Sequence, residues 1–255
     1  MQLTTFDNDA ALATFTRARQ ILEDAYGETH PSLGALHVNL GVIAIFQGRR
    51  AEAVQEFLRA LSIDERHLPA NHPAIASCLR ELGEGQMYSG DLMAALRTSE
   101  RSLEVHLAAH GAGHARVSVA LANLGLVLLR TGDQVAAEAA FTRALTEFRG
   151  AADEPELGRA YAGRGALRLA QGRVEEALAD LEAGLDRLQR NPNAAPFHVA
   201  EVQFALARAL SRGGGNASRA RSMAADAQKN FAVVGPGFQV EEAEVKTWVA
   251  QLPSG

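Results

Sequence analysis

The stretch that decides the fold is residues 39–60, NLGVIAIFQGRRAEAVQEFLRA, which recurs as residues 123–144, NLGLVLLRTGDQVAAEAAFTRA. Residues 81–102 carry a weaker copy, so the three copies follow one another at a constant spacing. Each copy has a Leu-Gly pair and a second glycine seven residues later, with apolar side chains at helical spacing between the two glycines. Glycine accepts the left-handed backbone conformation that ends a helix. Each copy therefore predicts a helix, a turn at the second glycine and another helix.

In the first and third copies the second predicted helix carries a small, a large and a small side chain at spacings of four and three. The stripe is weaker in the middle copy and in a fourth copy, which is marked by Gly165 and Gly172. The clearest trios are Ala53, Phe57, Ala60 and Ala137, Phe141, Ala144, and the weaker ones are Ala95, Ser99, Ser102 and Ala177, Leu181, Gly184. This spacing places the three side chains on one stripe of the helix. We expect two helices to approach closely at the small residues while the large side chain fills the gap.

Short links between the copies mark where each pair of helices begins. His30-Pro31, His72-Pro73 and His114-Ala115 recur with the same period as the copies, and Glu154-Pro155 stands at the following junction. Proline is tolerated in the first turn of a helix. The links therefore predict that each copy is an antiparallel helix hairpin.

The composition favours an all-helical protein and excludes several classes of function. Of the 255 residues, 47% are hydrophobic and only 5% aromatic, which argues against a β-sheet protein. Lys229 and Lys246 are the only lysines, and neither lies in a phosphate-binding loop, so a P-loop kinase or ATPase is excluded. The formal charge of −5 supplies no basic stripe for nucleic acid, and an anionic membrane is not an expected partner.

The single cysteine and the N-terminal segment bear on the compartment. Cys78 can form no disulfide within the chain, which fits a reducing compartment, and its apolar neighbours favour a packed side chain over a nucleophile. Residues 1–13 lack the features of a signal peptide, and no apolar stretch reaches the roughly 18 residues of a spanning helix. We therefore expect a soluble cytoplasmic protein.

The Leu-Gly pair, the glycine turn and the small-large-small stripe resemble those of tetratricopeptide repeats, and the 42-residue period with its His-Pro link is similar to the kinesin-light-chain subtype. The resemblance extends from about Ala10 to Val234. It implies an all-α fold, a right-handed superhelical solenoid of antiparallel helix hairpins, and the preference for arginine over lysine favours a bacterial source. Residues 1–255 are then a single array, with an incomplete repeat at 8–26, five repeats at 31–68, 73–110, 115–149, 155–190 and 196–233, and a capping helix at 238–252.

The first repeat of this array is incomplete. Ala11, Phe15 and Ala18 lie one period before the first complete trio, so they belong to a second helix whose first helix falls mostly before Met1. Because a lone second helix exposes its apolar face, we expect the chain to be a piece of a longer polypeptide. Two alternatives are that residues 1–6 fold over this face, or that a neighbouring chain covers it in a homo-oligomer.

The first helices of stacked hairpins line a concave groove in which a partner is bound. Positions counted from the Leu-Gly glycine give the candidate partner-binding residues Asn39, Arg80, Glu84, Tyr88, Asn123, Arg130, Arg159, Phe204 and Arg208.

Two kinds of side chain stand out among these candidates. The resemblance implies that an asparagine two residues before the glycine bonds a peptide backbone, because a carboxamide both donates and accepts. Asn39 and Asn123 match this position, while Glu81 and Gly163 replace it in other repeats. The arginines form either a cationic track for an acidic segment or a C-terminal carboxylate, or ion pairs with the glutamates Glu81, Glu84 and Glu201.

The sequence thus predicts a non-enzymatic protein–protein interaction scaffold that binds a peptide or helical segment of a partner, without metal or cofactor. An alternative is the regulatory or sensor tail of a larger bacterial signalling protein, such as a Ser/Thr kinase or a transcription regulator. A third hypothesis is an enzyme or metal protein that uses His106, His110 and His114, which are spaced by four, although Gly111 and Gly113 interrupt that helix face.

Overall fold

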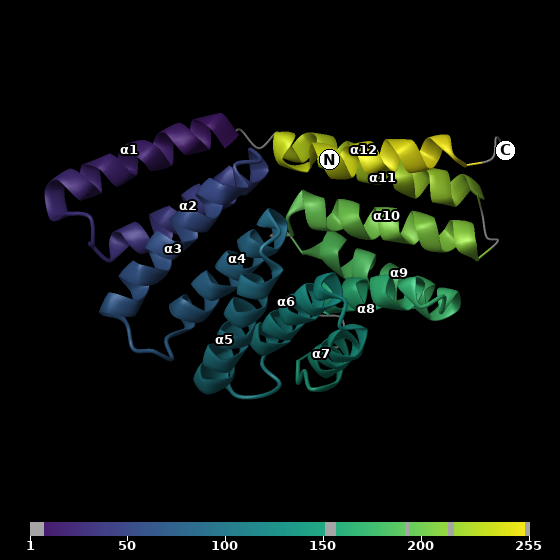
Figure 1. Ribbon diagram of the computed structural model, residues 1–255, viewed down its shortest axis with the longest axis horizontal. Coiled ribbons are helices and arrows are strands. Elements are labelled where there is room, and N and C mark those ends of the chain that lie inside the picture. The colour runs from purple at the N-terminus through teal and green to yellow at the C-terminus, as the bar shows by residue number, and fades with distance from the viewer. Residues whose placement is uncertain (1–7, 151–156, 192–193, 214–216, 253–255) are drawn as a thin grey trace. The chain divides into compact units, whose positions relative to one another are not determined.

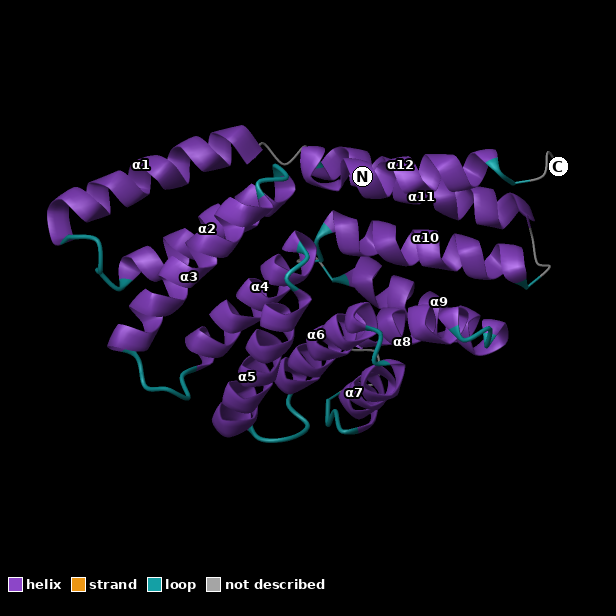
Figure 2. Cartoon of the chain, viewed as in Figure 1, coloured by secondary structure: helices purple, strands orange, loops and turns teal. Residues whose placement is uncertain are grey.

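The computed structural model describes residues 8–150, 157–191, 194–213 and 217–252, and the regular secondary structure in these ranges is entirely helical (Figure 2). The predicted all-α architecture of antiparallel helix hairpins is confirmed. The chain divides into two compact units, Met1–Gly111 and Ala112–Gly255. Among the helices so described, none is both long and apolar enough to cross a membrane.

Unit 1 contains two complete hairpins preceded by one further helix (Figure 1). Helix α1 packs on α2, α2 pairs with α3, α3 packs on α4, and α4 pairs with α5. The helices are α1 (Asn8–Tyr26), α2 (Ser32–Phe46), α3 (Arg50–His67), α4 (Pro73–Ser89) and α5 (Leu92–His110).

Unit 2 contains three hairpins followed by a last helix (Figure 1). Helix α6 pairs with α7, α8 with α9 and α10 with α11, and α12 packs on α11. The helices are α6 (Ala115–Thr131), α7 (Gln134–Thr146), α8 (Gly158–Ala170), α9 (Val174–Arg190), α10 (Pro196–Arg212), α11 (Ala217–Val234), the short 3-10 helix η2 (Pro236–Phe238) and α12 (Gln239–Ala250). The Glu154-Pro155 link and the segment 1–6 lie outside the described residues.

The glycine turns form as the sequence predicts. The second glycine of each copy has a positive φ, which is 75° at Gly48, 88° at Gly90, 90° at Gly132 and 79° at Gly172. At Gly90 the backbone is left-handed and its N–H donates to the carbonyls that end α4. This conformation is strained for residues with a Cβ atom, which explains why glycine recurs at this position.

Two histidines of the links, His72 and His114, cap the first helices α4 and α6. The Nδ1 atom of His72 accepts a hydrogen bond of 3.1 Å from the backbone N–H of Ala74, and His114 accepts one of 3.2 Å from Arg116. The first N–H groups of a helix have no partner within the helix, so such a cap stabilises its start. The recurrence of histidine in the links therefore has a structural role beyond marking where a hairpin begins.

The helices of each hairpin are held together by the predicted stripe. In unit 1, Ala53, Phe57 and Ala60 of α3 are almost fully buried. A Cβ atom on Gly41 of α2 would lie 2.5 Å from the Phe57 ring, so the ring occupies the space where a larger residue would have its side chain. The glycine of the Leu-Gly pair is thus required by packing.

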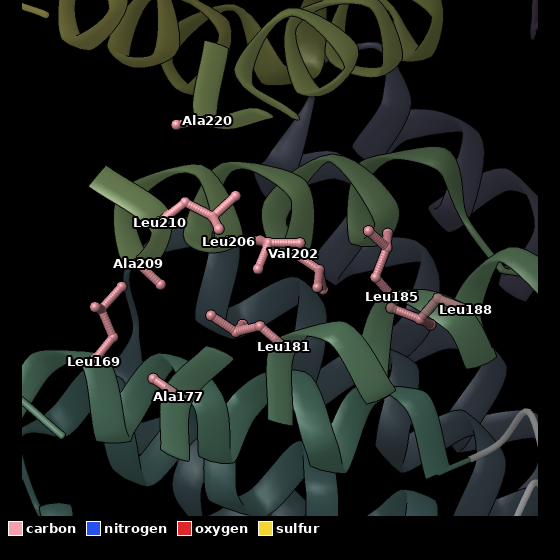
Figure 3. Packing of buried hydrophobic residues seen from close by; sticks show 10 residues of the cluster. All are labelled: Leu169, Ala177, Leu181, Leu185, Leu188, Val202, Leu206, Ala209, Leu210 and Ala220. Carbon is pink, nitrogen blue, oxygen red and sulfur yellow. The ribbon is translucent and has the colours of Figure 1, made fainter. Parts of the chain in front are cut away.

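A continuous apolar cluster joins the last hairpins of unit 2. It receives side chains from α8, α9, α10 and α11, which interdigitate between the helices (Figure 3). Leu181 and Leu206 at its centre have no exposed surface. Burial of a leucine side chain contributes roughly 1.5–3 kcal/mol, so this cluster fixes the positions of α8 and α10, which carry candidate partner-binding residues.

Candidate functional site

The first helices of unit 2 share one face. Helix α8 contacts both α6 and α10, and the Nη2 atom of Arg130 on α6 lies 3.9 Å from Oε1 of Glu201 on α10. Arg130 and Glu201 therefore lie on one face, which α6, α8 and α10 share. We call this face the groove of unit 2.

Asn123 of α6 is the most unusual side chain among the candidates in unit 2. It is only 6% exposed, and within the described residues neither its carboxamide nitrogen nor its oxygen has a hydrogen-bond partner. An unpaired buried polar group costs about 1–3 kcal/mol. Arg159 on α8 is partly buried, and Arg130 is exposed. The groove therefore combines an unsatisfied amide with basic side chains.

Phe204 and Arg208 of α10 lie at the end of the groove, next to α12. Phe204 is 9% exposed, and its ring centroid lies 5.6 Å from that of Trp248 in an edge-on arrangement. The Arg208 guanidinium lies 5.7 Å from the centroid of the same Phe204 ring. A cavity of about 530 Å³ opens between α10 and α12. Helix α12, expected only as a cap, thus contributes Trp248 to the same surface, and the single tryptophan on its apolar stripe was the signal for this.

In unit 1 the charged candidates are paired within their own helix. Arg80 forms ion pairs with Glu81 and with Glu84, the latter at 3.8 Å between Nη1 and Oε2. This arrangement agrees with the ion-pair alternative for the arginines. The side chains of these pairs are partly buried, with exposures of 26% for Arg80, 22% for Glu81 and 10% for Glu84.

The remaining candidates of unit 1 differ in accessibility. Asn39 on α2 is exposed, as a ligand-binding residue would be. Tyr88 on α4 is only 5% exposed, because Arg50 of α3 lies over it with the guanidinium 5.9 Å from the ring centroid. The Nη1 atom of Arg50 also donates a hydrogen bond of 2.9 Å to the Tyr88 carbonyl. Tyr88 therefore connects α3 and α4, and a partner reaches its ring only if Arg50 moves.

A buried charged cluster lies between the first three helices of unit 1. Glu56 of α3 is 4% exposed, and its Oε2 lies 2.6 Å from Nδ1 of His37 on α2. The Nη1 atom of Arg59 donates a hydrogen bond of 2.7 Å to Oε1 of Glu56, and Nη1 of Arg19 on α1 lies 3.6 Å from the same oxygen. Burial alone would raise the pKa of Glu56, but the His37 hydrogen bond and the charges of His37, Arg59 and Arg19 outweigh it and lower the pKa. The periodicity of the repeat contains no signal for this cluster, so sequence reasoning missed it.

A cavity of about 420 Å³ adjoins this cluster, lined by residues of α1, α2 and α3 and of the link that follows α1. Its lining includes Arg19 and Arg59 together with Glu23 and Glu28, so the charges of its walls largely cancel. The cavity therefore offers no clear preference for a cation or an anion.

The three histidines of the metal hypothesis have other contacts. His114 caps α6, and the rings of His106 and His110 stack with centroids 5.7 Å apart. Across the part of the chain that the structure describes, no three His, Cys, Asp or Glu side chains are placed to hold a metal ion.

Comparisons with solved structures agree with this architecture. BtubC (BKLC) from P. vanneervenii has a TM-score of 0.62 at 15% identity, over 98% of this chain and 94% of that one. A putative kinesin light chain from Podosopora anserina has a TM-score of 0.56 at 18% identity, over 80% of this chain and 97% of the other. The Rap conjugation gene regulator of the plasmid pLS20, solved with the Phr* peptide, has a TM-score of 0.67 at 17% identity, over 88% of this chain and 59% of that one. These similarities show the fold.

Comparison of the sequence itself identifies the family. No curated protein matches the chain. The tetratricopeptide repeat family matches residues 4–66 and 74–146, which together make up more than half of the chain. These segments contain the three copies at residues 39–60, 81–102 and 123–144, with their Leu-Gly pairs and turn glycines. The predicted family is therefore confirmed, and the chain belongs to the tetratricopeptide repeat family.

Proposed function

We propose that this chain is a non-enzymatic protein-interaction module that holds an extended segment of a partner polypeptide in the groove of unit 2. The observation that carries the proposal is the approach of Arg130 and Glu201 to 3.9 Å, because it places charged side chains of α6 and α10 on one shared face. The Rap regulator, which shares the fold, was solved with a peptide, and this supports the same class of ligand here.

The chemistry of the groove suits a peptide backbone. A carboxamide donates and accepts at once, so a peptide N–H and C=O would supply both partners that Asn123 lacks. Because both amide atoms are buried, a ligand would reach them only if the surrounding groups move. Arg130 and Arg159 would favour acidic side chains in the bound segment. Since the helices are ordered before binding, only the partner and a few groove side chains lose conformational freedom.

The test starts from a library of random dodecapeptides selected against the purified chain, followed by affinity measurements on the selected peptides by fluorescence polarisation. Asn123→Ala combined with Arg130→Glu should weaken binding by at least tenfold while the circular dichroism spectrum and thermal midpoint stay close to wild type. Arg143→Glu on α7 is the control, because Arg143 is a similarly exposed arginine on a second helix. It should change affinity by less than twofold.

Two results would overturn the groove as the binding site. One is a selection that returns no binding peptide. The other is a double variant that is folded and binds selected peptides as tightly as wild type, or that loses no more affinity than Arg143→Glu does.

A further inference from the structure

The cavity between α10 and α12 differs from the rest of the groove of unit 2. Its volume is about 530 Å³, which is large enough for the last residue or two of a peptide. We infer that this cavity binds a carboxylate of the partner peptide, an inference that rests on the proposed function. The residues on which the argument depends are Arg208, Ser211 and Arg212 of α10 and Glu244, Trp248 and Gln251 of α12.

Arg208 has the geometry of a carboxylate receptor. Its guanidinium lies over the Phe204 ring, and it forms no ion pair with any residue in the described ranges. Stacking on an aromatic face restrains the guanidinium plane while leaving its N–H groups able to donate at the edge. A planar guanidinium held in this way presents a fork that matches the two oxygens of a carboxylate.

Arg212 adds a second cation one helical turn further along α10. Its Nη1 donates a hydrogen bond of 3.0 Å to the Leu169 carbonyl at the end of α8, which anchors the side chain beside the cavity. The side-chain hydroxyl of Ser211 and the amide of Gln251 are further donors on the cavity wall. The wall on α10 is therefore rich in donors and positively charged.

Glu244 on the α12 side restricts which anions fit. With two arginines and one glutamate, the lining carries a net positive charge, so an anion is favoured. Glu244 repels a purely anionic ligand but accepts from an N–H group. A peptide end satisfies both walls, because its carboxylate lies next to backbone N–H groups. A free inorganic anion offers Glu244 no such N–H group.

Trp248 supplies an apolar wall and also a reporter. It is the only tryptophan in the sequence, it lines the cavity, and it packs edge-on against Phe204. A side chain that enters the cavity next to the carboxylate would contact the indole ring. Because the chain has no other tryptophan, its fluorescence reports on the surroundings of this one side chain.

The experiment uses a pool of random tryptophan-free dodecapeptides, prepared once with a free C-terminal carboxylate and once as the C-terminal amide. Peptides retained by the immobilised full chain are identified by mass spectrometry, resynthesised in both forms, and titrated while Trp248 emission is followed. We expect the acid form to bind at least tenfold more tightly than the amide, with a saturable change in emission. A peptide that instead loses affinity when an internal Asp or Glu becomes Asn or Gln places a side-chain carboxylate in the same cavity.

Variants of the chain connect this preference to Arg208. The ratio of the affinity for the acid form to the affinity for the amide form should fall from at least tenfold to below threefold in Arg208→Gln, while the affinity for the amide form changes little. Glu244→Gln should not reduce the ratio, because it leaves the guanidinium in place. Lys229→Gln is the control, since it removes one positive charge from the exposed surface of α11 and should leave the ratio unchanged.

The outcomes separate this inference from the proposed function. One outcome overturns the inference alone. In it, peptides bind and lose affinity with Asn123→Ala and Arg130→Glu, but their affinity does not depend on any carboxylate. An acid preference that Arg208→Gln leaves intact, or that is not accompanied by a change in Trp248 emission, also overturns it. Failure to retain any peptide from either pool overturns the proposed function and the inference with it.

Discussion

The ring of Phe141 in α7 lies against Gly163 in α8, so closely that a Cβ atom on Gly163 would stand 2.3 Å from a ring carbon. A Cβ atom on Gly125 of α6 would stand 2.6 Å from the same ring. One fully buried aromatic side chain therefore fills the space between three helices of unit 2. Counting along the repeat places Gly163 on the groove as a replacement for asparagine, but it is instead buried and makes room for Phe141.

Gly163→Ala should lower the stability of the protein. Alanine favours a helix over glycine by about 1 kcal/mol, but forcing a methyl group into a packed core costs roughly 1–3 kcal/mol. Because the added carbon would overlap an aromatic ring with no exposed surface, we expect the packing cost to exceed the gain in helix propensity. Urea denaturation followed by circular dichroism should show a net loss of about 1–2 kcal/mol.

A substitution of Phe141, whose ring lies against Gly163, supplies the control for this prediction. Phe141→Leu removes the ring atoms that the alanine would meet, so the double variant should lose less stability than the sum of the two single losses. If Gly163→Ala is as stable as wild type or more stable, or if the two losses simply add, the packing argument is wrong.

Asp180→Asn should destabilise the hairpin formed by α8 and α9. Asp180 is 4% exposed, and its carboxylate accepts two hydrogen bonds from Arg164, at 2.7 and 2.8 Å, and a third from Arg168 at 2.7 Å. The bonds from Arg164 are the leading cause of the raised pKa of that guanidinium. Removing one partner of a buried ion pair leaves the others uncompensated and costs roughly 3 kcal/mol, measured as a shift in urea midpoint.

An exposed aspartate in the same helix is the matched control for Asp180. Asp186 pairs with Arg190 at the surface of α9, with 60% of its side chain accessible to solvent. Asp186→Asn should therefore cost less than about 1 kcal/mol. Equal losses for the two variants would show that the buried network contributes no more than a surface ion pair.

Glu56→Gln should lower stability most strongly at neutral pH. The folded-state pKa of Glu56 lies below its ordinary value. The stabilisation that the ionised carboxylate gives the folded protein is therefore fully present above the unfolded-state pKa of about 4.3, and it is lost as the pH falls through the folded-state pKa. We expect a loss of roughly 3 kcal/mol at pH 7 and a smaller loss at pH 3, because the wild-type carboxylate itself becomes protonated. Urea denaturation at both pH values measures this, and a difference that stays constant or grows at pH 3 contradicts it.

The thiol of Cys78 should be unreactive in the folded protein. Burial is the largest cause that raises its pKa to about 12, and the nearby charges of Asp64 and Glu81 raise it further. The Sγ atom also donates to the Phe57 carbonyl at 3.5 Å. Only the thiolate is nucleophilic, so Ellman's reagent at pH 8 should release almost no chromophore until urea is added. Stoichiometric release within minutes in the native state would show that the site opens readily.

What the sequence predicts and what the structure shows differ most clearly in the candidate site. Asn123 and Phe204 were located by counting from the repeat glycine, because the position of a residue along a helix determines which face it occupies. Counting alone did not show that Tyr88 is covered by Arg50, or that Arg80 is paired with Glu84. These outcomes depend on which rotamer each long side chain adopts, and a periodic pattern leaves that open.

By itself, the sequence determined the helix hairpins, their turns and the stripes at which the helices meet. Those features depend on local propensity and on a pattern that each repeat carries within its own length. Only the tertiary structure decided that Glu56 is buried against His37, that Phe141 packs against both Gly125 and Gly163, and that Arg208 and Trp248 line one cavity. Each of these contacts joins side chains from different helices, so its geometry is set by how the helices pack against one another.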